Sequence, residues 1–159
     1  MRIEEVIKQC AKSGEEILWE KHNNSEAVVY HKSLMFFSEP GIVSAIRNSL
    51  SPPRLTESKK LNRYFNLVEK VESTTVKKEA FVSERKLLDS GIDAICLETM
   101  DGQRKWINKD LAEAFAFKRK YLFVDPSAID ADGITDDEIR NMVFIEEQGK
   151  IAGIVMILR

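Results

Sequence analysis

The stretch VSERKLLDSGIDAICLETMDGQRKWINKDLAEAFAF, residues 82–117, decides the fold that the sequence predicts. Ser83 is a favourable N-cap, and Val82 and Leu87 have the spacing of a hydrophobic staple around it. Gly91 follows where a left-handed backbone ends a helix at little cost. The sequence therefore predicts a helix between Ser83 and Gly91.

A hairpin and a second helix follow in the same stretch. Residues 93–99 and 103–107 read as two strands, and Asp101-Gly102 suits a two-residue type I′ turn, in which both central residues need positive φ. Asn108 is a good cap for a helix with one apolar face, formed by Leu111, Ala114 and Phe115. The stretch as a whole is thus expected to form helix, hairpin and helix.

Apolar periodicity predicts the elements on either side. In chain order these are a helix over 2–21, a long strand over 26–37, a helix carrying Ile42 to Leu50, a helix capped by Thr56, an undecided segment at 75–81 (strand or helical turn), a strand over 121–124, a short helix opened by Thr135, and a hairpin of strands 143–147 and 151–158.

These elements predict an α+β fold with a mostly antiparallel sheet, built from two hairpins and one long strand and covered by amphipathic helices. A single domain over 1–159 is expected, with an internal linker near 51–54, where Ser51-Pro52-Pro53 stops a helix. The expected core comprises the last strand together with Ile3, Val6, Ile7, Ile17, Leu18, Val28, Phe36, Ile46, Phe65, Leu87, Ile95, Leu97, Phe115 and Phe144.

Composition narrows the classes of protein. The 159 residues are 43% hydrophobic with a net charge of -2, which suits a globular domain with a proper core. Cys10 and Cys96 lie in amphipathic patterns, so we expect buried thiols. There is neither a long apolar run nor a leader pattern, so the sequence predicts a cytoplasmic protein without membrane association.

Charge is unevenly spread along the chain. Residues 54–120 carry 15 Lys/Arg against 11 Asp/Glu, whereas residues 121–159 carry 3 against 8. A solvated surface explains such a difference in many proteins. The other explanation is a basic surface that meets an anionic partner.

Patterns for catalysis, metal binding and phosphate binding do not occur. The chain has no G-x-S-x-G, C-x-x-C, H-E-x-x-H or glycine-rich phosphate loop. A calcium loop around Gly133 would put Ala128 and Ile139 where carboxylates are required. The sequence therefore predicts no catalytic residue, no metal ligand and no cofactor. A hydrolase or nuclease stays open as an alternative, with carboxylates from the two hairpins: Asp93, Glu98, Glu146 and Glu147, together with Lys150.

The element order over residues 55–107 resembles a winged helix. That resemblance implies that Arg85 and Lys86 face bases or phosphates, that Arg104 and Lys105 contact the phosphate backbone from the wing, and that Trp106 anchors the wing. The same stretch also resembles a cystathionine-synthase-type nucleotide-sensing repeat, with a helix, the hairpin of residues 91–107 and a second helix that begins at residues 108–111. This resemblance implies a small-molecule sensor as a further alternative. That resemblance lacks the Ser/Thr three residues before the Asp, where this chain has Ile107 before Asp110.

The leading prediction is a non-enzymatic regulatory or interaction protein. Its binding residues would be Arg85, Lys86, Arg104, Lys105 and Trp106 on a basic helix-hairpin surface. Its partner would be nucleic acid or an acidic protein surface, and the sequence does not fix its oligomeric state.

Overall fold

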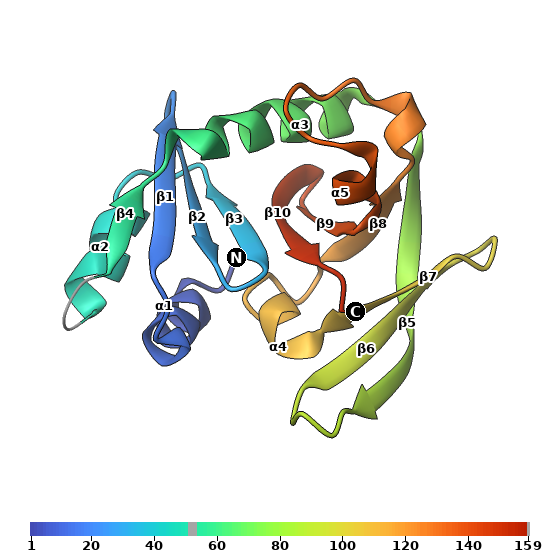
Figure 1. Cartoon of the computed structure of the whole chain (residues 1–159), viewed down its shortest axis with the longest axis horizontal. Coiled ribbons are helices and arrows are strands. Elements are labelled where there is room, and N and C mark those ends of the chain that lie inside the picture. Colours follow the sequence, from blue (N-terminus) through green and yellow to red (C-terminus); the bar gives the residue numbers. More distant parts are fainter. Residues whose placement is uncertain (51–53, 159) are drawn as a thin grey trace.

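The computed structural model describes residues 1–50 and 54–158. Over these residues the chain is α+β, with ten strands in one mixed sheet (Figure 1). The strands are β1 Ile17–His22, β2 Ser25–Tyr30, β3 Ser33–Phe37, β4 Leu55–Glu57, β5 Lys77–Leu87, β6 Asp93–Thr99, β7 Arg104–Asn108, β8 Lys120–Val124, β9 Met142–Glu147 and β10 Lys150–Met156. Their spatial order is β4-β1-β2-β3-β10-β9-β8-β5-β6-β7, and neighbours are antiparallel except for the pair β1 and β4.

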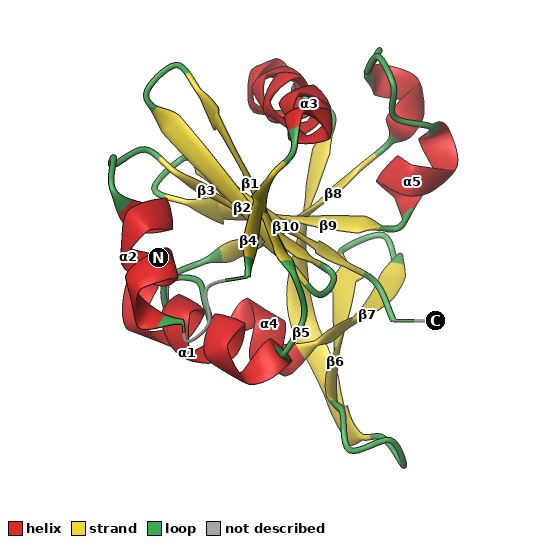
Figure 2. Cartoon of the chain, turned by 60° about the vertical axis from the view of Figure 1, so that its left-hand side comes forward, coloured by secondary structure: helices red, strands yellow, loops and turns green. Residues whose placement is uncertain are grey.

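Helices cover both faces of this sheet (Figure 2). They are α1 Ile3–Ser13, α2 Ile42–Ser49, α3 Asn62–Ser73, α4 Lys109–Ala112 and α5 Asp136–Arg140, with short 3₁₀ turns η1 Lys59–Leu61 and η2 Pro126–Ala128. α1, α2 and α4 pack on one face, and α3 and α5 on the other. β10 serves both cores: Val155 points to the first and Ile154 to the second, as the alternation along the last strand predicts.

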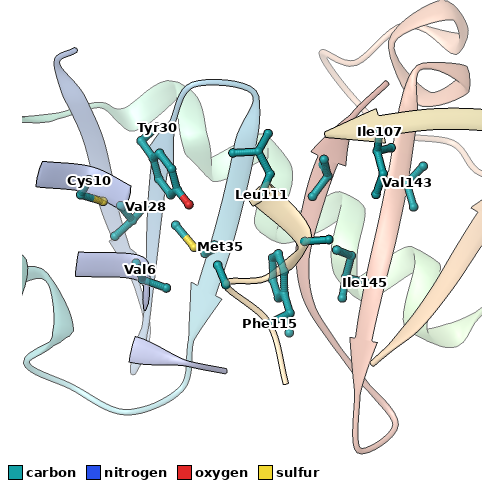
Figure 3. Packing of buried hydrophobic residues seen from close by; sticks show 14 of the residues in the cluster. Val6, Cys10, Val28, Tyr30, Met35, Ile107, Leu111, Phe115, Val143 and Ile145 are labelled. Carbon is teal, nitrogen blue, oxygen red and sulfur yellow. The ribbon is translucent and has the colours of Figure 1, made fainter. Parts of the chain in front are cut away.

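The first core joins the helices at the N-terminus to the middle of the chain (Figure 3). Val6 and Cys10 of α1 are fully buried beside Met35 of β3, and Phe115 is fully buried after α4. Gly153 of β10 lies directly under the Phe115 ring, where a Cβ would also stand 2.5 Å from the carbonyl oxygen of Leu34. A glycine is therefore required where this ring meets the sheet.

Tight turns connect the antiparallel neighbours. Gln148 and Gly149 both have positive φ, 51° and 81°, so the β9–β10 hairpin has the type I′ backbone. In the β6–β7 turn only Gly102 has positive φ, and its amide donates to the carbonyl of Thr99. The type I′ turn predicted at Asp101-Gly102 is therefore wrong: the turn is longer and ends in a left-handed glycine.

The sheet curls so that the chain beyond β10 returns to its far edge. The amide of Leu158 donates to the carbonyl of Trp106 on β7 at 2.8 Å. β5, β6 and β7 form a three-stranded arm that extends from the helix-covered body (Figure 1). The tail after β10 thus ties the outer strand of this arm to the body.

The helix predicted between Ser83 and Gly91 is wrong. Residues 83–87 belong to β5, which pairs with β6 from Ala80↔Thr99 to Leu87↔Asp93. Gly91 does have positive φ, but in the turn between two strands. The capping pattern at Ser83 and Gly91 depends on nearby residues only. The structure of the segment is determined instead by the pairing of β5 with β6, which a local sequence pattern does not reveal. The winged-helix and nucleotide-sensing resemblances both lose the helix on which they depend, and Leu87, predicted in the core, is 72% exposed.

Three further boundaries are corrected. The predicted helix 2–21 is α1 followed by β1, because Gly14 takes a left-handed conformation and ends α1. The predicted strand 26–37 is the hairpin of β2 and β3, turned at His31. Thr56 lies in β4 instead of capping a helix, and α3 begins at Asn62.

Other predictions are confirmed. The strands at 93–99, 121–124 and 143–147 are present, and Asn108 and Thr135 cap their helices through their side chains. Cys10 and Cys96 are buried thiols. Of the predicted linker near 51–54, residues 51–53 lie outside the described residues. Across the described ranges no helix has the length and apolarity to cross a membrane.

Candidate functional site

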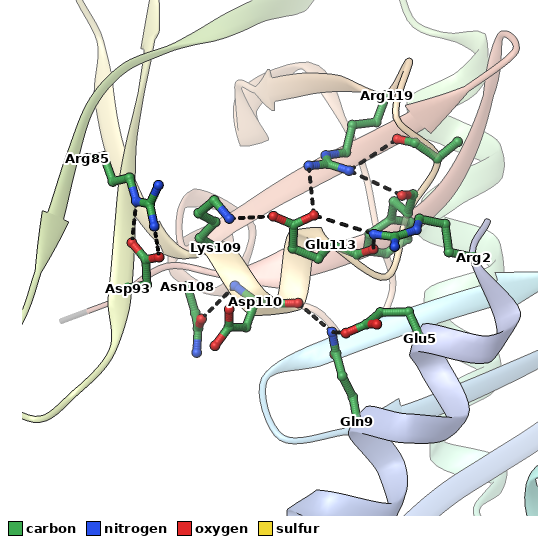
Figure 4. A network of polar contacts seen from close by, with 12 residues as sticks. Arg2, Glu5, Gln9, Arg85, Asp93, Asn108, Lys109, Asp110, Glu113 and Arg119 are labelled. Carbon is green, nitrogen blue, oxygen red and sulfur yellow. Dashed lines mark hydrogen bonds and ion pairs between the residues drawn. The ribbon is translucent and has the colours of Figure 1, made fainter.

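Two of the predicted binding residues lie on β5 and three on β7, so all five belong to the arm. Arg85 holds Asp93 through two hydrogen bonds, Nε–Oδ1 at 2.9 Å and Nη2–Oδ2 at 2.6 Å (Figure 4). This hydrogen bond from the Arg85 guanidinium lowers the pKa of Asp93. Arg85 is therefore already paired with a carboxylate. Lys86 is exposed and pairs with no carboxylate among the described residues.

Arg104 is also paired. Its Nη2 lies 2.8 Å from Glu84 Oε2, and its Nε lies 3.6 Å from Glu98 Oε1. Trp106, two residues on, faces the same side of β7 and is half-buried. The predicted surface is thus a set of internal ion pairs across the strands of the arm, with fewer available cations than its sequence implies.

Lys105 points to the opposite face of β7, into the curl of the sheet. Its half-buried ammonium lies 3.4 Å from the carbonyl oxygen of Met142 and 4.6 Å from the centroid of the Phe123 ring. Burial lowers the pKa of Lys105 to about 8. Among the described residues no carboxylate lies within 4 Å of this amine. It is the one predicted binding residue whose charge is both desolvated and without a counter-ion in that part of the chain.

A cleft of about 440 Å³ opens in front of Lys105, at the foot of the arm. We call it the Lys105 cleft. It lies between β7, the start of β5, β8, η2 and α5, and its lining residues are Val76, Lys78, Gln103, Arg104, Lys105, Phe123, Val124, Asp125, Pro126 and Arg140. Four cationic residues and one acidic residue line it; Lys78, Arg104 and Arg140 are paired with carboxylates, and Lys105 has no carboxylate partner among the described residues.

Sequence reasoning missed Lys78 and Arg140 as partners of Lys105. Lys78 stands opposite Phe123 in the β5–β8 ladder, and Phe123 is the ring beneath Lys105. Recognising residues 77–80 as a strand would have placed Lys78 there. Arg140, at the end of α5, reaches the cleft only through the curl of the sheet, which no spacing along the chain indicates.

The second feature of the arm is the open side of β5. β5 pairs with β6 as far as Leu87, but with β8 only from Lys77 to Ala80. Beyond Ala80 no strand of the described chain lies on that side. We call residues 81–87 along this side the β5 open edge. Its backbone N–H and C=O groups have no sheet partner, which makes it a template for an added strand.

Large apolar side chains are concentrated on the same seven residues. Phe81 is 54% exposed, Val82 53% and Leu87 72%. Single exposed apolar residues are common on protein surfaces, but a cluster on an unpaired strand is not. A bulge between Val82 and Glu84 and the charges of residues 84–86 discourage indiscriminate edge pairing. The β5 open edge therefore exposes apolar side chains and also has features that disfavour non-specific strand pairing.

The carboxylates of the hydrolase alternative have other partners. Asp93 is held by Arg85 and Glu98 by Arg104. Glu147 accepts from the amide of Ala116 at 2.7 Å and from the Met1 amine at 2.8 Å. In the described part of the chain no three His, Cys, Asp or Glu side chains gather in a way that could hold a metal ion.

Another polar cluster is structural. Glu113, after α4, contacts Lys109 at 2.5 Å, Arg2 at 3.5 Å and Arg119 at 4.0 Å (Figure 4). The hydrogen bond from Lys109 is the main cause of its lowered pKa. These pairs join the start of the chain to the segment that leads into β8.

A larger groove of about 940 Å³ lies beside α3 and the β9–β10 turn, with Phe36, Phe65 and Phe117 among its lining. Its acidic residues Glu69, Glu72 and Glu147 are matched by cations such as Lys118 and Lys150. The mixed lining favours no ligand class.

Comparison with known proteins adds no relative. No family model matches the chain, and neither a curated protein nor a solved structure matches it significantly.

Proposed function

We propose that this protein is a non-enzymatic interaction protein that binds an extended, partly acidic segment of another protein as an added strand on the β5 open edge. The observation that carries the proposal is the overhang of β5: residues 81–87 are paired on one side only and expose Phe81, Val82 and Leu87. Strand addition draws affinity from main-chain hydrogen bonds and specificity from alternate side chains.

The structure of the other edge of the arm, at β7, favours strand addition at β5. β7 is the last strand of the sheet, yet its Trp106 carbonyl is already occupied by the Leu158 amide. The arm is therefore anchored on the β7 side and open on the β5 side. An added strand beside β5 would continue the line of β8, which stops at Lys120 opposite the last paired residues.

Charge favours an acidic partner. Glu84 and Arg85, in the middle of the edge, are neutralised by Arg104 and Asp93. Lys86 on the edge and Lys120 at the start of β8 are exposed, and neither pairs with a carboxylate among the described residues. A segment that alternates apolar residues with Glu or Asp would cover Val82 and Leu87 on one face of β5 and meet the two lysines, which lie with Phe81 on the other face.

Synthetic peptides test this proposal. A fluorescent peptide of about ten residues that alternates Val or Leu with Glu is titrated against the protein, since a strand of this length spans the edge. We expect saturable binding. A peptide with Lys in place of Glu should bind more weakly, and a peptide with N-methylated alternate amides should not bind, because it cannot complete the ladder.

Variants of the protein provide the matched controls. Val82→Glu and Leu87→Glu should abolish binding, whereas Met100→Glu should not, because Met100 is an equally apolar residue, 94% exposed, in the β6–β7 turn away from the edge. Lys86→Glu should weaken binding by about fivefold, the upper range for one exposed ion pair.

Three results would contradict the proposal. Peptide binding that ignores Val82→Glu would place the contact elsewhere. Concentration-dependent self-association abolished by Val82→Glu would make a second copy the occupant of the edge. Salt-sensitive binding to duplex DNA or RNA, with no peptide binding, would favour a nucleic-acid partner instead.

A further inference from the structure

The half-buried positive charge of Lys105 in this cleft has no counter-ion among the described residues. Removing an ammonium from water is costly unless an opposite charge or several hydrogen bonds replace its hydration. Lys105 has the Met142 carbonyl at 3.4 Å and the face of Phe123, and no carboxylate among the described residues. The burial of the amine therefore lowers the pKa of Lys105.

The other cations that line the cleft are held in ion pairs. Lys78 pairs with Asp101 at 2.5 Å and Arg140 with Asp137 at 2.8 Å, both in exposed geometry that contributes little and rearranges easily. Arg104 borders the cleft but is held by Glu84 on the opposite face of the hairpin.

Asp125 is the single acidic residue in the lining. It accepts hydrogen bonds from the amide and hydroxyl of Ser127, at 3.0 and 2.9 Å. These bonds are the main cause of its lowered pKa, and the charges of Arg140 and Lys78 lower it further. The Asp125 carboxylate is thus held by hydrogen bonds within its own turn. Lys78 and Arg140 line the same cleft as Asp125.

We propose that the Lys105 cleft binds a phosphate-bearing small molecule, with the phosphate facing Lys105 and flanked by Lys78 and Arg140. The size of the cleft suits a small ligand. Its apolar side, formed by Val76, Phe123 and Pro126, offers a surface for an organic group attached to the phosphate. The cleft is separate from the β5 open edge, so this proposal does not depend on strand addition.

A distinctive consequence is proton uptake. A bound phosphate stabilises the charged form of Lys105, so above about pH 8 binding must bring a proton to the amine. The other charged residues that line the cleft are Lys78, Asp125, Arg140 and Arg104, the last held by Glu84 on the opposite face of β7. Replacing Lys105 with arginine keeps the positive charge but removes the proton exchange, because arginine stays charged.

Isothermal titration calorimetry with phenyl phosphate and with inorganic phosphate tests the proposal. The wild type should bind phenyl phosphate, and titrations near pH 9 in buffers of different ionisation enthalpy should reveal proton uptake. Lys105→Met should weaken binding by about tenfold or more, the value of one charge-assisted hydrogen bond. Lys105→Arg should retain binding without proton uptake, and Lys60→Met, which removes an exposed lysine of η1 outside both proposed sites, should behave as wild type.

Comparison of the two anions distinguishes their sources. Tighter binding of phenyl phosphate supports an organic phosphate, and equal binding supports a free phosphate as the occupant. The proposal is overturned if neither anion binds the wild type saturably, or if Lys105→Met, shown to be folded by circular dichroism, binds as the wild type does.

Discussion

The half-buried ammonium of Lys105 should leave a signature in stability that Lys105→Met removes. In the folded protein burial lowers the pKa of this amine to about 8. The unfolded chain has a lysine pKa of about 10.4. Between these two pH values the unfolded chain keeps a proton that the folded protein has released, so the free energy of unfolding rises with pH.

The size of the effect follows from the two pKa values. Charging Lys105 in the folded state costs about 3 kcal/mol at pH 7, whereas at pH 10 the cost falls to about 1 kcal/mol, because the folded amine is then neutral. Partial exposure of the side chain screens the charge, so we expect a change of about 2 kcal/mol between these pH values. Methionine has similar length and carries no charge, so its variant does not have this pH-dependent term.

Urea unfolding of the wild type and of Lys105→Met at several pH values between 7 and 10 measures this difference. Lys105→Met should be the more stable protein at pH 7, and its advantage should shrink by about 2 kcal/mol towards pH 10. Titrations common to both proteins cancel in the comparison. Lys86→Met, at an exposed position of β5, serves as the control for the loss of a lysine from the arm. A Lys105→Met advantage that does not change with pH would refute the assignment of a desolvated amine to the cleft.

Three substitutions test the fold that holds the arm. Gly153→Ala should destabilise the protein by about 3 kcal/mol in urea unfolding, because the new methyl group meets the Phe115 ring and the backbone carbonyl of Leu34; an unchanged midpoint would contradict this close packing. Gln148→Asn should raise the free energy of unfolding by about 0.5 kcal/mol, because asparagine tolerates the positive φ of this turn better than glutamine, and a loss of stability would argue against the type I′ turn. Thr135→Ala should cost about 1 kcal/mol by removing the hydroxyl that accepts from the Glu138 amide at the start of α5, whereas Thr75→Ala, at an exposed threonine just after α3, should change the thermal midpoint little.

The parts of the fold that depend on local chemistry could be predicted from the sequence. The β9–β10 hairpin follows from two apolar strands around Gln148-Gly149, and the caps at Asn108 and Thr135 follow from side chains that satisfy amides two or three residues away. The two faces of β10 follow from alternation alone. In each case the residues that determine the structure are close neighbours in the chain.

The predictions are wrong where the structure of a segment depends on residues that are distant in the sequence. Ser83, with Val82 and Leu87, has the pattern of a helix start, yet the segment is held in a ladder with β6. His31 turns the chain between β2 and β3 although it is neither glycine nor asparagine, because pairing of the flanking strands imposes its positive φ. These are competitions between local preference and sheet pairing, which the sequence of one segment does not resolve.

The candidate site was foreseen in part for the same reason. The predicted cations of the hairpin are present on β7, but alternation sends Arg104 and Lys105 to opposite faces. Arg104 there meets Glu84, and Lys105 enters a cleft completed by Arg140, which lies 35 residues further along the chain. The open edge was missed because the helix predicted at the same residues would have had no edge.

Hydrogen exchange of the backbone amides of β5, followed residue by residue by NMR, tests the central claim most directly. In the free protein, amides of residues 81–87 that face β6 should be protected, while those that face the open side should exchange rapidly. Addition of the acidic-apolar peptide should protect the rapid amides and leave residues 77–80, already paired with β8, unchanged. Uniform protection of residues 81–87 before any peptide is added, or protection that arises elsewhere on binding, would contradict an open edge that takes an added strand.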